Sequence, residues 1–183
     1  SQAEDGTVTL GEELFDNPDL NQGWEPPARE GDVRTDIGAV PYWESWAMVN
    51  GNWQYDDTGY ATVKATASET NGDGVTLISR QNGVSGTAIV AQKVDEFEAG
   101  KKYRLTFDAT KTGENYLYVI CGTDRNKIST RGTFGTTEED PTVETKTFDF
   151  TFNYGEKFIG FLQENWKNTT IYNASLKEIK AVN

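Results

Sequence analysis

Residues 103–109 read Tyr-Arg-Leu-Thr-Phe-Asp-Ala, so that apolar and polar side chains alternate without a fault. Successive side chains of a β-strand point to opposite faces of a sheet, and this alternation therefore predicts a strand with one buried face. Residues 147–152, Thr-Phe-Asp-Phe-Thr-Phe, repeat the pattern and place three phenylalanines on one face. We find no convincing helical period elsewhere in the chain, so these two segments set the fold class as all-β.

Further short segments of the chain also have strand character. Between them lie dipeptides and short runs rich in Gly and Asn, which are typical of tight turns. Many short strands separated by such turns predict an antiparallel β-sandwich or a barrel. The additional strands are expected at residues 61–67, 87–94, 116–121, 158–162 and 170–179.

The length of the chain, 183 residues, predicts a single domain that can bury a core without disulfides. Aromatic residues make up 12% of the sequence, and disordered acidic chains are poor in aromatics. We therefore expect a folded β-sandwich domain over residues 12–183. Residues 1–11 are small, acidic and rich in Gly and Thr, which predicts a tail or linker.

Charge and composition exclude several functions. Seventeen Lys and Arg face 29 Asp and Glu, for a net charge of −12, which argues against nucleic acid, anionic membranes and polyanionic glycans. The chain contains no histidine, which excludes a Ser-His-Asp or Cys-His catalytic centre. Its one cysteine excludes an intramolecular disulfide and a thiolate metal cluster. No apolar run approaches the length of a membrane span, so we expect no membrane insertion.

Three segments follow one another in an order that matches a known family. Residues 13–24 contain Glu-Leu-Phe-Asp-Asn-Pro-Asp-Leu and then Gly-Trp. Residues 92–109 contain Gln-Lys-Val and then Ala-Gly-Lys-Lys-Tyr-Arg-Leu-Thr-Phe-Asp-Ala, and residues 170–176 read Thr-Ile-Tyr-Asn-Ala-Ser-Leu. Together they resemble carbohydrate-binding modules of the family 4/9/22 type, over about residues 12–180. The resemblance implies a jelly-roll β-sandwich that binds a neutral glycan, commonly on its concave sheet, without cleaving it.

Many modules of this type hold a structural calcium ion, and the resemblance locates its usual ligands in the first and last segments. The matching positions here are Asn21 and Tyr172, and neither carries a carboxylate. Calcium prefers six to eight oxygen ligands that include carboxylates. We therefore expect the usual calcium site to be weakened or absent, with Asp16 and Asp19 as the candidate ligands of a shifted site and otherwise no cofactor.

Aromatic side chains supply the candidate glycan-binding residues. Sugars stack their C–H faces on aromatic rings, while their hydroxyls need amides, carboxylates or guanidinium groups as partners. Four of the five tryptophans fall within residues 24–53, in a polar, proline-marked stretch, and the fifth has only polar neighbours. A core position remains the alternative for each ring, because large aromatics also dominate core burial. The expected binding residues are Trp43, Trp46, Trp166, Tyr116, Tyr118 and Gln92.

The sequence is compatible with three functions. The first is a non-catalytic carbohydrate-binding module, secreted or at the cell surface and free-standing or tethered to a larger polysaccharide-processing protein. The second is a structural or adhesion domain of a cell-surface protein that binds a protein partner. The third is a jelly-roll glycoside hydrolase or lyase; a hydrolase needs two suitably spaced carboxylates, and the chain has no Glu-x-Asp-x-x-Glu strand signature. We favour the first.

Overall fold

A computed structural model describes residues 8–22, 40–49, 52–53, 62–81, 84–112, 117–124, 127–135, 139–164 and 168–182. All regular elements in these ranges are β-strands, and every strand pair is antiparallel. None of the described residues forms a helix long and apolar enough to cross a bilayer. The strands are β2 (Val8–Glu13), β3 (Glu44–Val49), β4 (Asn52–Trp53), β5 (Thr62–Ser68), β6 (Gly72–Ile78), β7 (Arg80–Gln81), β8 (Val84–Ser85), β9 (Thr87–Lys93), β10 (Lys102–Thr112), β11 (Leu117–Asp124), β12 (Lys127–Phe134), β13 (Glu139–Thr151), β14 (Phe158–Gln163) and β15 (Asn168–Val182).

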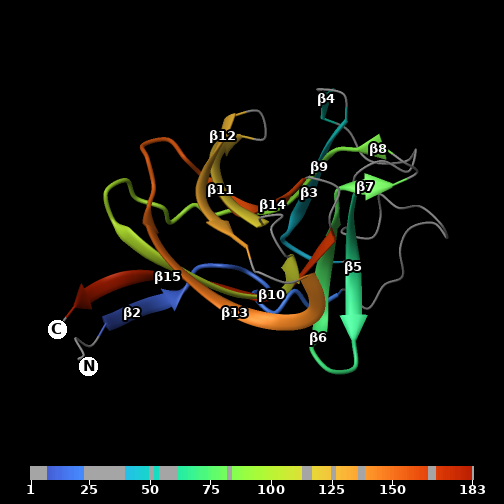
Figure 1. The fold of residues 1–183 in the computed structure, drawn as a ribbon. Coiled ribbons are helices and arrows are strands. Elements are labelled where there is room, and N and C mark those ends of the chain that lie inside the picture. The colour runs from blue at the N-terminus through green and yellow to red at the C-terminus, as the bar shows by residue number, and fades with distance from the viewer. Residues whose placement is uncertain are drawn as a thin grey trace.

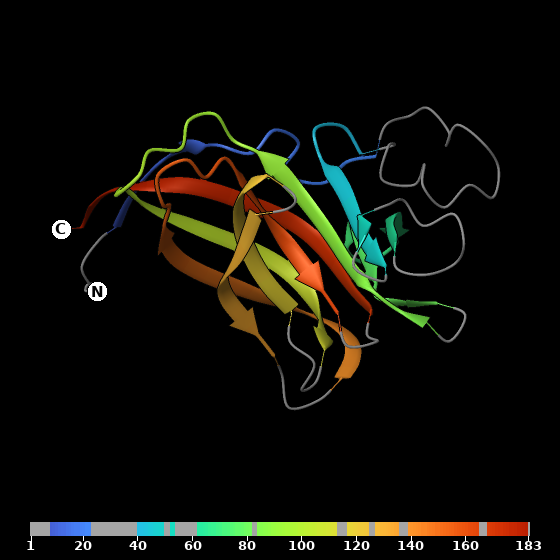
Figure 2. The same ribbon diagram turned by 90° about the horizontal axis from the view of Figure 1, so that it is seen from above.

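The strands form two large sheets and one short hairpin, as Figures 1 and 2 show. Sheet 1 has the order β13-β10-β15-β6-β5, and β2 also pairs with β15. Sheet 2 has the order β12-β11-β14-β9-β3-β4, and β7 pairs with β8 in the hairpin. The prediction of an all-β antiparallel sandwich is therefore confirmed.

One hydrophobic core lies between the two sheets. The predicted alternation of residues 103–109 is confirmed, because Tyr103, Leu105 and Phe107 are at most 1% exposed while the residues between them are half-buried. Sheet 2 contributes Val90, Val119 and Phe161 from its inner face to the same cluster, among other residues. The core thus joins residues far apart in the sequence and accounts for the sandwich.

The long strand β15 lies inside sheet 1, with β10 on one side and two strands that share its other side. Its first residues pair with β6 and its last residues pair with β2, so that two strands follow each other along the same side. Between them the loop at residues 14–20 closes the gap, because the amide of Ala174 donates to the carbonyl of Pro18 at 2.7 Å. Residues 8–11, predicted as tail or linker, belong to β2 because they pair with β15 (Figure 1).

Candidate functional site

The outer face of sheet 2 carries a second hydrophobic cluster, separate from the core. Strand alternation directs one set of side chains inward and leaves the next set on the outer face. The outer set is nonetheless apolar, and several of its members are fully covered. The cluster consists of Trp46, Ile89, Ala91, Ile120 and Leu162, with Tyr118, Ile128 and Phe158 packed half-buried against it.

Strand register aligns these side chains in rows that cross the strands. Trp46 pairs with Ile89 on β9, Ile89 with Leu162 on β14, and Leu162 with Tyr118 on β11. Adjacent strands lie about 4.8 Å apart, so the row from Trp46 to Tyr118 spans about 14 Å. The sheet thus brings together two of the residues that the sequence predicts as glycan-binding, at opposite ends of one apolar row.

A pair of aromatic rings covers the next row. The ring centroids of Trp46 and Phe158 are 5.3 Å apart, in an edge-to-face arrangement. Between the row of Trp46 and the row of Phe158 lies the row of Ala91 and Gly160, which pair with each other across β9 and β14. A Cβ at Gly160 would lie 2.1 Å from the carbonyl oxygen of Val90, so only glycine fits there. The small residues beneath allow the two rings to meet over the sheet, and Trp46 is only 7% exposed as a result.

Polar side chains border the apolar rows. The indole N–H of Trp46 donates to Oε1 of the exposed Glu44 at 3.3 Å. Glu44 lies in the row of Ala91, and the exposed Lys93 lies in the row of Phe158. On β12 the exposed Thr130 and Thr133 pair with residues of the cluster. The face therefore combines half-buried rings with hydroxyl, carboxylate and ammonium groups, which is the combination that a sugar chain requires.

Two predicted binding residues lie on the core side of sheet 2 instead. Trp43 is 5% exposed and packs on Phe15 in the core, with ring centroids 4.7 Å apart, and its indole N–H donates to the carbonyl of Asn17. Gln92 is 3% exposed, and its amide forms two hydrogen bonds with the backbone of Asp16. Alternation along β9 turns Gln92 inward, and Trp43 points into the core from the turn that precedes β3. Neither has a surface to offer a ligand, which corrects the expectation for these two residues.

Of the remaining predicted residues, one lies on the outer face of sheet 2 and two lie outside the residues that the structure describes. Tyr118 is half-buried on the outer face of sheet 2. Trp166 and Tyr116 lie outside the described residues. Sequence reasoning missed Phe158 and Glu44 as members of the face. The signal was present for Phe158, because alternation along residues 158–162 places it on the same side as Gly160 and Leu162.

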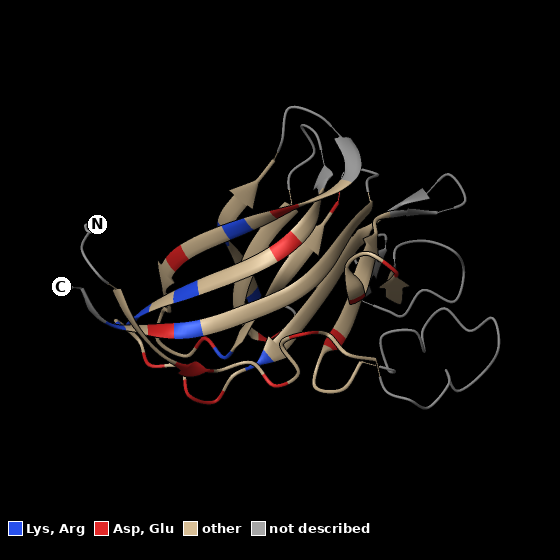
Figure 3. Ribbon diagram, turned by 90° about the horizontal axis from the view of Figure 1, so that it is seen from below, with Lys and Arg blue, Asp and Glu red and all other residues tan. Residues whose placement is uncertain are grey.

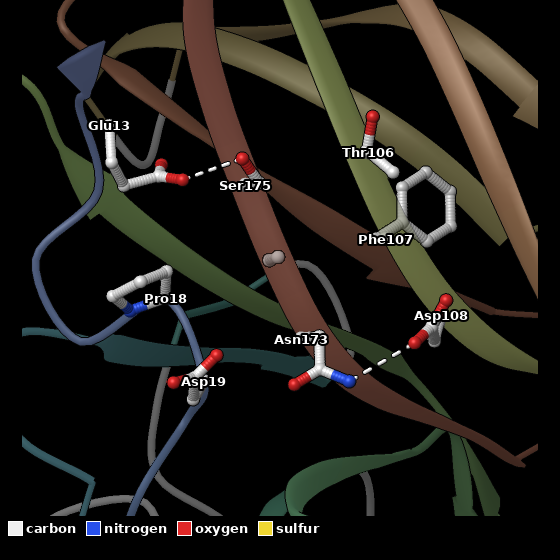
Figure 4. A pocket seen from close by; sticks show the side chains of 9 residues that line it. Glu13, Pro18, Asp19, Thr106, Phe107, Asp108, Asn173 and Ser175 are labelled. Carbon is white, nitrogen blue, oxygen red and sulfur yellow. Dashed lines mark hydrogen bonds between the residues drawn. The ribbon is translucent and has the colours of Figure 1, made fainter.

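A pocket of about 180 Å³ lies on the other side of the molecule, on the outer face of sheet 1 (Figure 4). It is lined by three carboxylates, those of Glu13, Asp19 and Asp108, together with Asn173 and Ser175. Two of the three carboxylates already serve the fold. Glu13 accepts hydrogen bonds from the Ser175 hydroxyl and from a backbone amide of β15, and Asp108 accepts one from Asn173 at 3.0 Å.

This pocket is also the place to test the expected calcium ligands. Asp19 lines it, whereas Asp16 does not, and both side chains are exposed. Among the described residues, no group of three or more Asp, Glu, His or Cys side chains is placed to hold a metal ion. A shifted calcium site at Asp16 and Asp19 therefore stays a prediction.

The single cysteine is an unreactive core residue. Burial raises the pKa of the Cys121 thiol far above its ordinary value. Its side chain is fully buried on the inner face of β11. Because the thiolate is the reactive form, Cys121 offers no nucleophile at neutral pH.

Comparison with known proteins identifies the fold. No family model and no curated protein sequence matches the chain. Among solved structures, a variant of a family 29 carbohydrate-binding module complexed with mannohexaose superposes with a TM-score of 0.51 at 12% identity, over 94% of this chain and 93% of that one. The K3 cleaved adhesin domain of Lys-gingipain from Porphyromonas gingivalis gives 0.51 at 11% identity, over 93% and 99%.

A third similar structure is the enzymatically active domain of tailspike protein 4 from bacteriophage CBA120, with a TM-score of 0.54 at 16% identity. The match covers 88% of this chain but only 22% of the tailspike chain, so it concerns a small part of that protein. At these identities the likeness concerns the fold. The chain therefore has the jelly-roll β-sandwich fold of carbohydrate-binding modules, as its sequence resemblance predicts.

Proposed function

We propose that this protein is a non-catalytic module that binds neutral glycan chains on the outer face of sheet 2. The observation that carries the proposal is the second hydrophobic cluster, which exposes parts of Tyr118 and Phe158 beside polar groups. The five central members of this cluster are at most 9% exposed, so the half-buried rings of Tyr118 and Phe158 are the parts of the cluster that a ligand could reach. The fold of carbohydrate-binding modules supports the choice of a glycan as the ligand.

The arrangement of the face indicates how the glycan lies. The apolar row from Trp46 to Tyr118 crosses four strands, so a chain of several linked sugars would run across the strands rather than along them. Tyr118 and Phe158 would contact C–H faces of the sugars, while Glu44, Lys93 and the β12 threonines would bond hydroxyls. Trp46 is nearly covered, and its role would be to support Phe158 and hold the shape of the face.

The same proposal covers location and assembly. Polysaccharides lie outside cells, which favours a secreted or cell-surface protein, and tethering to a larger polysaccharide-processing protein would bring an enzyme to its substrate. No cofactor is part of the proposed binding, so a chelator should leave the affinity unchanged. An adhesion domain that binds a protein is the second candidate, favoured by the fold likeness to the gingipain adhesin domain.

The test is affinity electrophoresis and calorimetry of the full chain with neutral mannan, xylan and β-glucan and with mannohexaose. We expect binding to at least one of them, and we expect Tyr118→Ala to weaken it about ten-fold, or by about 1.4 kcal/mol, because a stacking ring is lost. Thr147→Ala, an exposed residue on sheet 1, is the matched control and should bind as the unsubstituted protein does. Absence of binding to all neutral glycans would favour the adhesion function, and release of reducing sugar would contradict a non-catalytic role.

A further inference from the structure

The turn at residues 40–43 holds a tyrosine in a backbone conformation that normally requires glycine. The amide of Trp43 donates to the carbonyl of Val40 at 3.4 Å, which closes a four-residue turn. Pro41 occupies its second position, and Tyr42 occupies its third with φ of 74°. Proline followed by a positive φ defines a type II turn, whose third residue is usually Gly or Asn. A bulky side chain at this position strains the backbone.

Two other turns of the same kind have a glycine at the third position. In the turns at residues 98–101 and 153–156, the amide of the last residue donates to the carbonyl of the first, at 3.3 and 3.1 Å. Their third residues are Gly100 and Gly155, each with φ of 88°. The second of these turns also carries a tyrosine, Tyr154, but at its unstrained second position. Tyr42 is therefore an exception to the pattern of these turns.

Burial does not offset the strain at Tyr42. The residue is 68% exposed, so most of its surface contacts solvent. Backbone strain that persists without a packing gain is a feature of residues that contact ligands. A tyrosine ring combines a flat apolar face with a polar tip, and this makes it well suited to recognition.

The structure holds the strained turn firmly in place. Asn17 clamps it: its side-chain Nδ2 donates to the carbonyls of Pro41 and Asn21 at 3.1 and 3.0 Å, and its backbone carbonyl accepts the indole N–H of Trp43 at 2.9 Å. Trp43 itself is anchored in the core. The residues on both sides of Tyr42 are thus fixed, and its exposed ring is presented on a rigid support. Rigid presentation lowers the entropic cost of binding.

The turn leads directly into the proposed glycan face. Glu44, two residues after Tyr42, is the first residue of β3 and pairs with Ala91 in the second row of that face. We infer that Tyr42 is a further aromatic contact of the bound glycan and stacks on a sugar at the β3 edge of sheet 2. The inference rests on the proposed function and extends the binding surface from the sheet to the turn that precedes it.

The test uses substitutions that separate an effect on binding from an effect on stability. Glycine adopts a positive φ without strain, so Tyr42→Gly removes the ring and the strain together. We expect its affinity for the glycan that the unsubstituted protein binds to fall about ten-fold. Its unfolding temperature should stay within about 2 °C of the unsubstituted value, because relief of strain offsets the entropy that glycine loses on folding. Tyr42→Phe keeps the ring and should keep the affinity within about two-fold.

Tyr154→Ala is the matched control, since it removes a tyrosine that is 94% exposed in a turn of the same type. It should change neither affinity nor unfolding temperature. Unchanged affinity of Tyr42→Gly, beside a binding-competent unsubstituted protein, would overturn the inference and leave the proposed function intact. A loss of affinity accompanied by a fall of more than about 5 °C would also overturn it, because it would assign Tyr42 a structural role. If the unsubstituted protein binds no neutral glycan, the proposed function fails and the inference fails with it.

Discussion

In both sheets the strands alternate between inward and outward side chains, yet the two outer faces differ in chemistry. On sheet 1 the outer face is polar, and its groups bond to one another: the hydroxyls of Thr66, Thr76 and Thr170 form a chain with oxygen separations of 2.7 and 2.8 Å. On sheet 2 the outer face is a hydrophobic cluster with half-buried aromatic rings. Figure 3 shows the first face, on which acidic and basic positions interleave along β13, β10 and β15.

This difference underlies the choice of sheet 2 for the proposed binding face. A polar outer face is the ordinary solution for a strand that faces water, and its internal hydrogen bonds leave little to offer a ligand. On sheet 2 the buried apolar cluster contributes to stability, and its half-buried rings, Tyr118 and Phe158, are also within reach of a ligand. The two faces therefore make opposite predictions for substitutions, and these predictions can be ordered by size.

The largest effect is expected at Gly160, which allows the rings on the outer face of sheet 2 to meet. In Gly160→Ala the new Cβ would lie 2.1 Å from the Val90 carbonyl oxygen and 2.6 Å from Cα of Ala91. Both atoms belong to the backbone of β9, which cannot move without breaking the pairing of β9 with β14. We expect a loss of about 3 kcal/mol in the free energy of unfolding, measured by urea denaturation.

Gly132→Ala is the control for this substitution. Its nearest atoms are ring carbons of Phe134 and Phe148, all at 3.1 Å, and side chains can shift where backbone cannot. We expect a loss of about 1 kcal/mol. Equal losses in the two variants would contradict the close approach of β14 and β9 at Gly160.

A smaller effect is expected from exchanging the chemistry of the two faces. Ile120 is 1% exposed on the outer face of sheet 2, so Ile120→Thr removes apolar contacts and buries a hydroxyl. We expect it to lower the free energy of unfolding by about 2 kcal/mol. The reverse change on sheet 1, Thr147→Ile, concerns an exposed residue and should alter stability by at most about 0.5 kcal/mol. If Ile120→Thr were equally mild, the cluster on sheet 2 would not be a packed unit.

The sequence predicts the fold well because alternation is a local property. Strands β5, β9, β10, β11, β13, β14 and β15 each overlap a predicted segment. The sequence does not predict β6 or β12. The opening Gly-Asp-Gly of β6 is typical of a turn, and β12, Lys-Ile-Ser-Thr-Arg-Gly-Thr-Phe, has two apolar side chains among eight residues. Their places are set by pairing with neighbouring strands, and β12 pairs with β11 through two register shifts.

The site is less predictable, because a period of two does not say which face is the inner one. Trp43 and Trp46 occur in the same polar stretch, yet one packs in the core and the other lies in the outer cluster. Gln92 was predicted as a surface amide, but its partner, the backbone of Asp16, is 76 residues away. The strain at Tyr42 likewise depends on a backbone angle, although Pro41 beside it already indicated a turn.

The smallest effect is expected on the outer face of sheet 1, at the ion pair of Arg104 and Asp149. The guanidinium donates two hydrogen bonds to the carboxylate, at 2.8 and 3.0 Å, and this hydrogen bonding raises the pKa of Arg104. The two side chains are 27% and 40% exposed, so water and salt screen their attraction. Arg104→Ala should therefore lower the free energy of unfolding by at most about 0.5 kcal/mol at low salt.

The same variant also tests whether the outer face of sheet 1 takes part in glycan binding. At about 1 M NaCl the Debye length falls to about 3 Å, and the stability difference between Arg104→Ala and the unsubstituted protein should nearly vanish. Its affinity for glycan should equal that of the unsubstituted protein at either salt concentration, because the pair lies on the sheet opposite the proposed binding face. A weakened affinity would move the binding surface to sheet 1, and the polar groups there would have to be regarded as ligands rather than as partners of one another.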